Sequence, residues 1–339
     1  MASYYVNAAT GSNANAGTSP GAAWETVQYA LTNTVGEDRI NLADAAPFSE
    51  SGLSLPDNGG RYIAGYTSAE GDGGVFEIDG GGSSVLPYTT NNRKLVIENG
   101  IVGNCGSSTV LGLYFECHVR NLKIHTTTGS SPISAATNNA VLVESCWFTD
   151  LAVDVYQTTS QRMVFWDCFF EDGDTYQFGT GFGTNNAIVG YQPCINCVFH
   201  NITASCWVGQ NVWSHFLDNA ILGGGSNVLT AVRAGSTVAG RTFVFGNRIE
   251  NAAVGIYTPY ASSFGSGLSN NQFYDCTTNY TDPFSTGGID YGNESLGSSP
   301  FAKTGSPTFA NRATYFARPS VGGTPTTFHP LKSRALGPR

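Results

Sequence analysis

Charged side chains are scarce in this sequence of 339 residues. Asp, Glu, Lys and Arg make up 12% of it, about half of the roughly 25% that is usual in a soluble domain. Lysine occurs only at Lys94, Lys123, Lys303 and Lys332. Segments that stay unfolded through charge repulsion are much richer in charge, so the composition excludes that class. Because phosphate binding needs clustered Lys and Arg, we also expect no nucleic-acid partner.

Long apolar runs are absent as well. No stretch of the sequence approaches the ~18 consecutive apolar residues that a membrane span requires, so we expect no membrane insertion. The first residues, MASYYVNAATG, lack the basic and then apolar pattern of a secretory signal. This predicts synthesis in a cytoplasm without export.

The charges that are present are unevenly distributed. All 25 acidic residues precede residue 300, whereas six of the 16 basic residues follow it. The segment 300–339 also contains six prolines, most of them interspersed with Phe and Tyr. Proline cannot donate a hydrogen bond to a β-ladder, so this segment is predicted to be an irregular basic tail.

A strand-like segment recurs through the middle of the chain. Its copies read VIENGI, VRNLKI, VESCWF, FWDCFF, CINCVF, FLDNAI, VFGNRI and LSNNQF, at steps of 22 to 29 residues. One alignment column holds Asn99, Leu122, Cys146, Cys168, Cys197, Asn219, Asn247 and Asn271. The positions three before and two after this column are apolar in every copy, and the position directly before it is polar or Gly. Strict alternation would place the position three before the column and the position directly before it on one face. Because the first is apolar and the second is polar or Gly, each strand must bend next to the column.

This repeat predicts an all-β fold, a single-stranded right-handed parallel β-helix. At the ~4.8 Å spacing between strands, an inward Asn of the column can bond to the equivalent amide one coil away. Cys or Leu can replace it because these side chains have few or no polar atoms that need a hydrogen bond when buried. We expect a cap and irregular coils in residues 1–95, regular coils in 96–299 and the tail in 300–339.

The cysteines are predicted to be reduced and buried. Three of them occupy the inward column, and Cys194 lies on the neighbouring apolar column. Cys194 and Cys197 have C-x-x-C spacing, but they fall on either side of one bend and no second such pair completes a zinc site. We therefore predict no metal site built from cysteine.

The opening segment YYVNAATGSNANAGTSPGAAWETVQYAL and the Asn-Asn-x-Phe/Ile repeat together resemble a known family. They are similar to the pectate-lyase-like right-handed parallel β-helix proteins, which include carbohydrate-active enzymes, bacterial surface proteins and phage spikes. The likeness covers about residues 3–300 and is closest in character to phage spike and decoration proteins. It implies a short capping helix over residues 22–31, in which Trp24, Val27, Ala30 and Leu31 cover the first coil.

A column of acidic and amide residues is the best candidate for a catalytic site. Asp150, Asp172, Asn201 and Asn251 each lie four residues past the inward column, and Asp174 is close by. Carboxylates stacked ~5 Å apart repel each other unless one is protonated or a cation separates them. Asp150, Asp172 and Asp174 could therefore serve a lyase or glycosidase, and Asp150 and Asp172 are a weak Ca²⁺ candidate. Turns also favour Asp and Asn for local backbone bonding, so a structural role stays open.

Outward aromatic residues are the second candidate feature. Trp147, Trp166, Tyr156 and Tyr257 are expected on the surface of the rod, where they could stack on sugar rings or be buried against an identical chain. Because phage β-helix rods usually associate as trimers, the resemblance implies a homotrimer.

The absence of the catalytic motifs that the resemblance would require favours a non-enzyme. We therefore predict a phage virion structural protein located in the virion: a β-helical capsid decoration, fibre or spike that uses a rigid rod for display. Its tail would bind other virion or capsid proteins, through Arg312, Phe316, Arg318, Phe328, Lys332 and Arg334. Host surface polysaccharide is a further expected partner, and no cofactor other than Ca²⁺ is considered. Two alternatives remain: a polysaccharide lyase or glycoside hydrolase, and a non-catalytic adhesin that is extracellular or at the cell surface.

Overall fold

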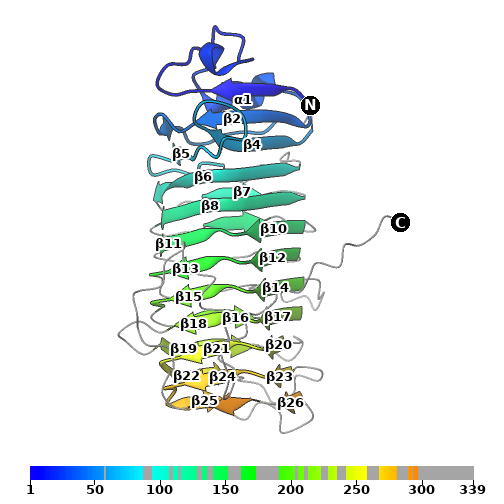
Figure 1. The fold of residues 1–339 in the computed structure, drawn as a ribbon, viewed down its shortest axis with the longest axis vertical. Helices are drawn as coiled ribbons and strands as arrows, with labels where there is room; N and C mark the ends of the chain where they lie inside the picture. Colours follow the sequence, from blue (N-terminus) through cyan, green and yellow to red (C-terminus); the bar gives the residue numbers. More distant parts are fainter. Residues whose placement is uncertain are drawn as a thin grey trace, which may run out of the picture.

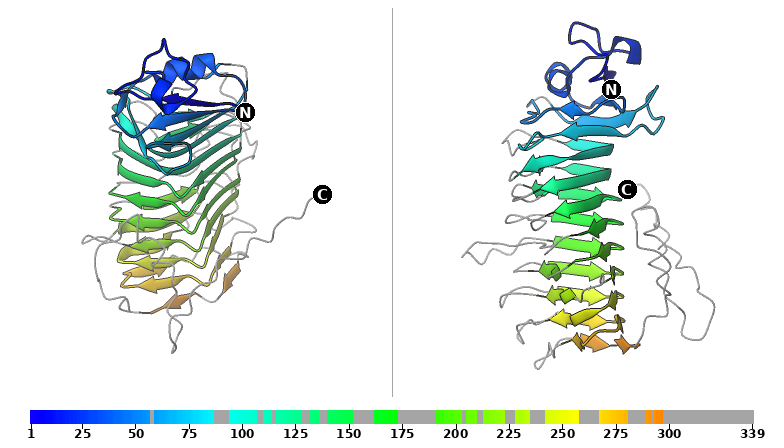
Figure 2. Two further views of the ribbon diagram at one scale, coloured as in Figure 1. Left: turned by 45° about the horizontal axis from the view of Figure 1, so that its top comes forward. Right: turned by 90° about the vertical axis from the view of Figure 1, so that its left-hand side faces the viewer.

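The chain winds into an elongated stack of coils whose strands all pair in parallel (Figures 1 and 2). The computed structural model describes residues 1–56, 59–86, 94–106, 110–113, 116–127, 132–135, 140–151, 162–172, 191–202, 205–209, 213–222, 228–234, 242–257, 267–280, 289–291 and 293–296. The predicted parallel β-helix is confirmed. Within the described part of the chain, no helix is long and apolar enough to cross a membrane.

Most coils contribute two strands to the largest sheet, one before and one after a sharp bend. The strands before the bend are β1 (Ser3–Val6), β2 (Asp38–Ala43), β4 (Arg61–Tyr66), β6 (Leu95–Gly106), β8 (Cys117–Thr127), β10 (Ala140–Glu144), β12 (Arg162–Trp166), β14 (Tyr191–Ile195), β17 (Trp213–Leu217), β20 (Thr242–Phe245), β23 (Gly267–Ser269) and β26 (Ile289–Tyr291). The strands after the bend are β3 (Phe48–Ser49), β5 (Phe76–Asp79), β11 (Trp147–Leu151), β13 (Phe169–Glu171), β15 (Val198–His200), β18 (Ala220–Leu222), β21 (Arg248–Glu250), β24 (Gln272–Tyr274) and β27 (Glu294–Ser295). Strands β6 and β8 run through the bend and belong to both sets.

Two smaller sheets complete the described coils. One contains β16 (Ser205–Gly209), β19 (Val228–Ala234), β22 (Ala252–Tyr257) and β25 (Thr278–Tyr280), and the other contains β7 (Leu111–Leu113) and β9 (Ile133–Ala135). Because β1, β2 and β4 pair in sequence with β6, the stack begins well before residue 95. The division of the chain at residues 95 and 299 stays a prediction, and 300–339 lie outside the described residues.

In the coils from β6 to β24 the bend is a single residue with a left-handed backbone. Its φ lies between +50° and +70°, a region that Gly, Asn and Asp tolerate best. The residues at this position are Asn99, Asn121, Ser145, Asp167, Asn196, Asp218, Gly246 and Asn270. This explains why the sequence is polar or Gly there, and it confirms the predicted strand, bend, strand unit.

The residue after the bend points inward, and in the last coils it builds a continuous ladder of carboxamides. Nδ2 of Asn219 donates to Oδ1 of Asn247 at 3.0 Å, Asn247 donates to Asn271 at 2.9 Å, and Asn271 donates to Asn293 at 2.8 Å. The backbone N–H groups of Asn219, Asn247 and Asn271 also donate to the next Oδ1. Each Nδ2 reaches back to a carbonyl of the preceding coil as well. Polar atoms buried at the bend are thereby satisfied, as predicted; Asn293 is a rung that the sequence repeat did not include.

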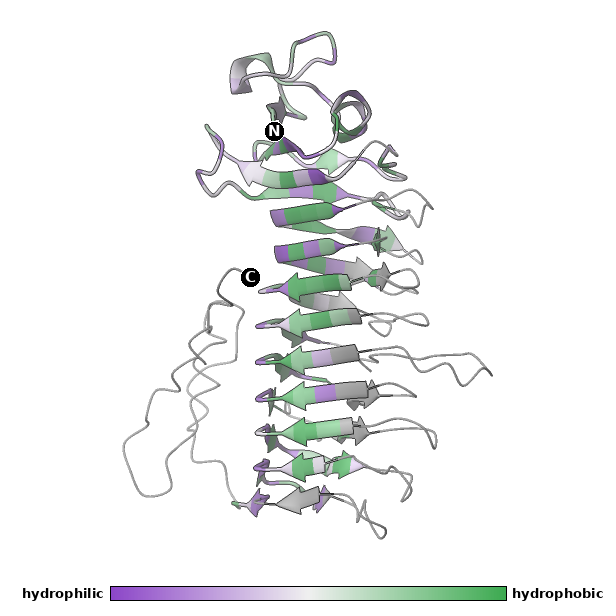
Figure 3. Cartoon of the chain, turned by 90° about the vertical axis from the view of Figure 1, so that its right-hand side faces the viewer, coloured by the Kyte–Doolittle hydropathy of each residue, from purple (hydrophilic) through white to green (hydrophobic). Residues whose placement is uncertain are grey.

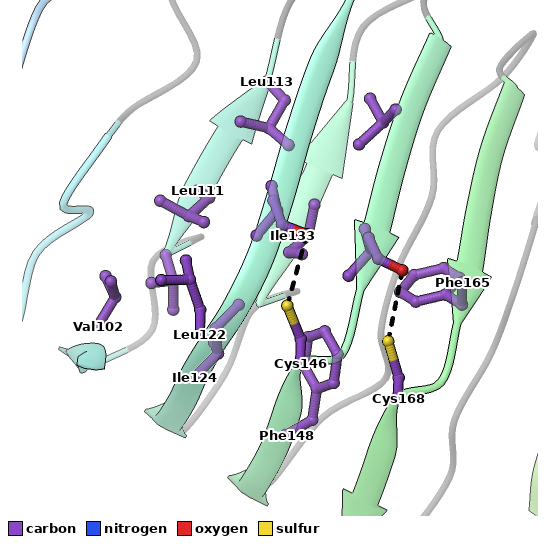
Figure 4. Close-up of a cluster of buried hydrophobic side chains, with 14 of the residues drawn as sticks. Val102, Leu111, Leu113, Leu122, Ile124, Ile133, Cys146, Phe148, Phe165 and Cys168 are labelled. Atoms are coloured by element: carbon purple, nitrogen blue, oxygen red, sulfur yellow. Dashed lines mark hydrogen bonds between the residues drawn. The ribbon is translucent and has the colours of Figure 1, made fainter. Parts of the chain in front are cut away.

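Cysteines continue this ladder toward the N-terminus. The thiols of Cys146 and Cys168 lie on neighbouring coils and donate to the carbonyls of Val119 and Val143, at 3.6 and 3.4 Å (Figure 4). Sγ of Cys197 accepts the N–H of Cys168 at 3.4 Å. The thiols thus reproduce, more weakly, the bonds that the carboxamides make. Cys146, Cys168, Cys194 and Cys197 are free and buried, which confirms the predicted stack of reduced thiols.

The sequence alignment of the first copy of the repeat is wrong by one residue. Gly100, not Asn99, pairs with Leu122, and Asn99 is the bend residue, whose Oδ1 accepts Nδ2 of Asn121 at 2.8 Å. A side chain at position 100 would collide with the ring of Phe76, since its Cβ would lie 2.3 Å from Cζ. The inward position of this coil therefore holds glycine, and the prediction that Asn99 belongs to the ladder is wrong.

Aromatic stacking fills the middle of the rod beside the ladder. The rings of Phe148, Phe170 and Phe199 stack in parallel, with centroids 4.8 and 4.7 Å apart. This spacing equals the distance between parallel strands, so identical side chains in successive coils pack face to face.

The N-terminal cap is a short helix, but it starts later than predicted. Helix α1 (Val27–Asn33) begins after Thr26, whose Oγ1 accepts the N–H of Tyr29, and the 3-10 helix η1 (Pro20–Ala22) precedes it. Trp24 is extended and bridges to Val6, so the expected helix over 22–31 is wrong in its bounds. The predicted covering role is confirmed, because Trp24, Val27, Ala30 and Leu31 are buried in the core.

We expect Asn247→Ala to lower the free energy of unfolding by at least about 3 kcal/mol. The substitution removes the partner of the Asn219 N–H and the Nδ2 donor to the carbonyl of Phe216, and it takes one hydrogen bond each from Nδ2 of Asn219 and Oδ1 of Asn271. A buried group left unsatisfied costs about 1–3 kcal/mol, and a lost hydrogen bond costs about 1 kcal/mol. Denaturant unfolding measures the loss. The matched control is Asn270→Gly, an exposed bend residue at φ +54°, where glycine keeps the backbone and the change stays within about 1 kcal/mol. Equal losses would contradict the ladder's role.

Stability should also fall in alkaline solution because of the buried thiols. Burial raises the pKa of the Cys146, Cys194 and Cys197 thiols. The unfolded chain then releases these protons at lower pH than the folded chain does, so stability is complete below the ordinary thiol pKa and declines above it. The slope approaches about 1.4 kcal/mol per pH unit for each thiol. Unfolding measured between pH 8 and pH 10 tests this, and a Cys146→Ala, Cys197→Ala variant with an unchanged slope would refute it.

Candidate functional site

The position two residues before each inward rung faces outward and forms one continuous row along the rod. We call it the outer row. Backbone register places its members opposite one another on successive coils. The flanking residues, such as Ile97, Val119, Val143 and Phe165, point into the core, so the row lies on the outer face of the sheet. It begins with Glu98, Arg120, Glu144, Trp166, Ile195, Leu217 and Phe245, and Ser269 and Tyr291 follow in register.

Glu98 and Arg120 form the charged beginning of the outer row. The Glu98 carboxylate accepts hydrogen bonds from the hydroxyl of Tyr62 and from Nη2 of Arg120. Its side chain is only 6% exposed, whereas that of Arg120 is 44% exposed. The guanidinium of Arg39 lies over the Tyr62 ring, 4.5 Å from its centroid. Glu98 is thus a buried anchor that holds Arg120 with much of its guanidinium open to solvent.

Next along the row, Glu144 pairs with His118. Nε2 of the imidazole lies 2.8 Å from Oε2 of Glu144, and the side chains are 30% and 38% exposed. A carboxylate at this distance favours the proton on Nε2 and leaves the lone pair on Nδ1. His118 is in register with Leu142 and Val96, so it lies beside the outer row on the same face of the sheet.

Trp166 follows Glu144 directly in the row. It is 48% exposed and stands in register between Glu144 and Ile195. Directly after it comes the bend residue Asp167, which accepts a hydrogen bond from Oγ of Ser145 at 3.0 Å. The four coils from β6 to β12 therefore carry, in sequence, a fixed guanidinium, an imidazole–carboxylate pair and an open indole face. These groups can bind an anion, move a proton and stack on a sugar ring.

The other predicted tryptophan lies on the opposite side of the bend. Trp147 is in β11, where Nζ of Lys123 sits 4.3 Å from its ring centroid and Nε1 donates to Glu171 at 3.1 Å. The indole face is thus occupied by a lysine. Glu171 also lies 3.4 Å from Nδ1 of His200. The structure separates the two tryptophans, and Trp166 is the more open of them.

Three residues of the predicted acidic column themselves have a left-handed backbone and form a second turn in their coils. Asp172, Asn201 and Asn251 all have φ near +50°, which agrees with the turn-forming role left open by the sequence. Asp172 accepts a hydrogen bond from Nδ2 of Asn201 at 2.5 Å. Asp150 lies in β11, but its side chain is outside the described part of the structure, as is all of Asp174. A catalytic or Ca²⁺-binding role for these residues stays a prediction.

The remaining predicted site residues are only partly placed. Tyr257 is half-buried at the end of β22, in a different sheet from the outer row. Tyr156 and the tail residues Arg312, Phe316, Arg318, Phe328, Lys332 and Arg334 lie outside the described residues. Among the residues that are described, no three His, Cys, Asp or Glu side chains are grouped to hold a metal ion.

Sequence reasoning missed Glu98, Arg120, Glu144 and His118, although a usable signal was present. With the first copy aligned on Gly100 instead of Asn99, Glu98 falls into the same column as Arg120, Glu144 and Trp166. The one-residue error placed Glu98 among the bend residues. The charge alternation along the column was therefore hidden.

Comparison with known proteins identifies the fold. No protein-family model and no curated protein sequence matches this chain. Among solved structures, a rhamnogalacturonan lyase is similar over 91% of this chain and 84% of its own length, at a TM-score of 0.55 and 12% identity. A GH136 lacto-N-biosidase from Eubacterium ramulus has a TM-score of 0.48 at 14% identity, covering 86% of this chain and 67% of its own. The structural neighbours are thus carbohydrate-active enzymes, and the first of them shares the β-helix fold.

We expect Glu98→Ala to destabilise the protein by about 2–3 kcal/mol, because a nearly buried carboxylate with two hydrogen bonds is lost. Glu144→Ala is the matched control. It removes a carboxylate from the same row, but its pair with His118 is partly exposed and such pairs contribute about 0–1 kcal/mol. Denaturant unfolding of both variants compares them, and equal costs would show that Glu98 is not an anchor.

Proposed function

We propose that this chain binds an acidic polysaccharide along the outer row and cleaves it by β-elimination. The observation that carries the proposal is the placement of His118 and Arg120 on β8, Glu144 on β10 and Trp166 on β12, three successive coils of one outer face. Neighbouring strands of a sheet are about 4.8 Å apart, which is close to the length of one sugar unit. A polysaccharide lying along the rod axis would therefore meet one member of the row with each successive unit.

Arg120 is suited to bind the carboxylate of a uronic acid unit. Guanidinium groups bind carboxylates through paired hydrogen bonds. Because Glu98 holds one side of Arg120, the exposed remainder is fixed in place before substrate arrives. Neutralising a substrate carboxylate makes the hydrogen on the adjacent carbon more acidic, since negative charge develops on that carboxylate as the proton leaves.

His118 is placed to remove that hydrogen. With Nε2–H directed at Glu144, Nδ1 carries the lone pair that accepts the proton. The electrons of the C–H bond form the new C=C bond, and the glycosidic C–O bond on the next carbon breaks. The departing oxygen takes a proton from water or from the imidazolium. No oxidant is required, and the products are one unsaturated and one ordinary sugar chain.

Hydrolysis by two carboxylates fits this row less well. Glycosidases use one carboxyl group as acid and a second as base or nucleophile. Glu98 and Glu144 are the carboxylates of the row, but Glu98 is enclosed by Tyr62 and Arg120. One open carboxylate beside an imidazole and a guanidinium supports elimination instead. The fold shared with a rhamnogalacturonan lyase gives independent support for a polysaccharide substrate.

We expect His118→Ala to reduce kcat by about 10²–10⁴-fold, the usual contribution of a general base, with little change in KM. Trp166→Ala should mainly raise KM. The assay follows the absorbance of the new double bond with a panel of bacterial and plant acidic polysaccharides. The matched control is His200→Ala, which removes a histidine paired with Glu171 on the other side of the bend and should leave turnover unchanged.

Three other outcomes of this assay are informative. Release of reducing ends without a double bond, abolished by Asp172→Asn, would favour a hydrolase at the predicted acidic column. Binding without turnover, lost in Trp166→Ala, would favour the adhesin. Equal losses in the His118 and His200 variants would contradict the assignment of the base.

The tail that the predicted virion role uses as its anchor, residues 300–339, lies outside the described part of the chain. It stays a prediction, as do the trimer and the partners bound through the tail. A phage spike that cleaves polysaccharide would combine both roles, so a mass-spectrometric inventory of virions tests the location independently of the activity.

A further inference from the structure

The outer row changes its chemistry after Trp166. Ile195, Leu217 and Phe245 occupy the next three positions in register, and all three are half-buried. In Figure 3 the strands of the upper coils are banded purple and green, whereas those of the coils below are mainly green. The row thus begins with charged groups and continues as an apolar strip.

The positions beside this strip are apolar except for His215. One position to the side lie Val164, Pro193, His215 and Phe243, again one on each coil. The rings of His215 and Phe243 stack with centroids 5.0 Å apart, and Phe243 meets Phe245 edge-on at 5.6 Å. The bend residues Asp167, Asn196 and Asp218 border the strip on its other side. The result is a narrow apolar track with one polar edge.

This track suits sugar units that carry methyl groups. The side chains of Ile195, Leu217 and Phe245 offer no partner for a hydroxyl group, and a hydroxyl covered without a hydrogen bond is unfavourable. A methyl group in the same place gains from leaving water. We infer that the substrate has an acidic unit at Arg120 followed, beyond Trp166, by units bearing O-acetyl, O-methyl or 6-deoxy methyl groups. This inference rests on the proposed function of the outer row.

The track favours a polysaccharide over a second copy of this chain. It is a direct continuation of the row that carries the ionisable groups, so one extended ligand can cover both. A stable interface between copies usually needs about 800 Å² from each partner, and among the large apolar side chains in the described part of the row only Trp166 is exposed. A narrow track bordered by polar bends matches an extended chain better than a broad protein surface.

The experiment uses an O-acetylated acidic polysaccharide and the same preparation after mild alkaline deacetylation, together with a second pair that differs only in 6-deoxy against hydroxymethyl units. The full chain should cleave the methyl-bearing member of at least one pair about tenfold faster in kcat/KM, which is within the range of selectivity that a single methyl group supplies. The two pairs identify which methyl source is recognised.

Leu217→Ser and the milder Ile195→Thr should reduce this preference, because they slow cleavage of the methyl-bearing member more than cleavage of the methyl-free member. The matched control is Leu296→Ser, an exposed leucine after β27, which should keep the preference. Equal cleavage of both members by the unmodified protein, or a preference retained in both variants, would overturn the inference but not the proposed function. Loss of self-association in Leu217→Ser would instead identify the track as an interface between copies. Failure to bind or cleave any preparation would overturn the proposed function and the inference with it.

Discussion

The left-handed bend and the inward rung that follows it are the constraint on which the rest of this molecule depends. A chain that turns sharply inside a stack of strands exposes peptide groups to an apolar interior. Here the side chain after the bend supplies the missing partners, through the carboxamides of Asn219, Asn247 and Asn271 and more weakly through the thiols of Cys146 and Cys168. Because each rung needs the next at one strand spacing, the ladder keeps successive coils in register.

That register is what brings separate parts of the sequence together on the outer surface. Glu98, Arg120, Glu144 and Trp166 are 22 to 24 residues apart in the chain, yet they stand on adjacent strands. All four lie on strands, and none of them lies on a loop. The site therefore lies on hydrogen-bonded strands, where the backbone loses little conformational freedom on binding.

The sequence was sufficient to predict the coil, the bend and the buried thiols, since each of these recurs in several copies. Features that occur once were harder to place. The start of α1 depends on the cap at Thr26, and the first rung depends on a collision between Phe76 and any side chain at Gly100. Neither is visible without neighbours in space. The ionisable residues were missed because the periodicity of charge is a weaker signal than that of apolar residues, and one misaligned copy was enough to hide it.

The succession of nearly equivalent coils has a consequence for how such a surface can diversify. Each coil closes its own bonds with the coils above and below, so a 22-residue unit can be duplicated or deleted without creating a new core. Such an event lengthens or shortens the outer row by one position and leaves the order of its other members intact. The length of the rod then depends on how many times the unit has been copied.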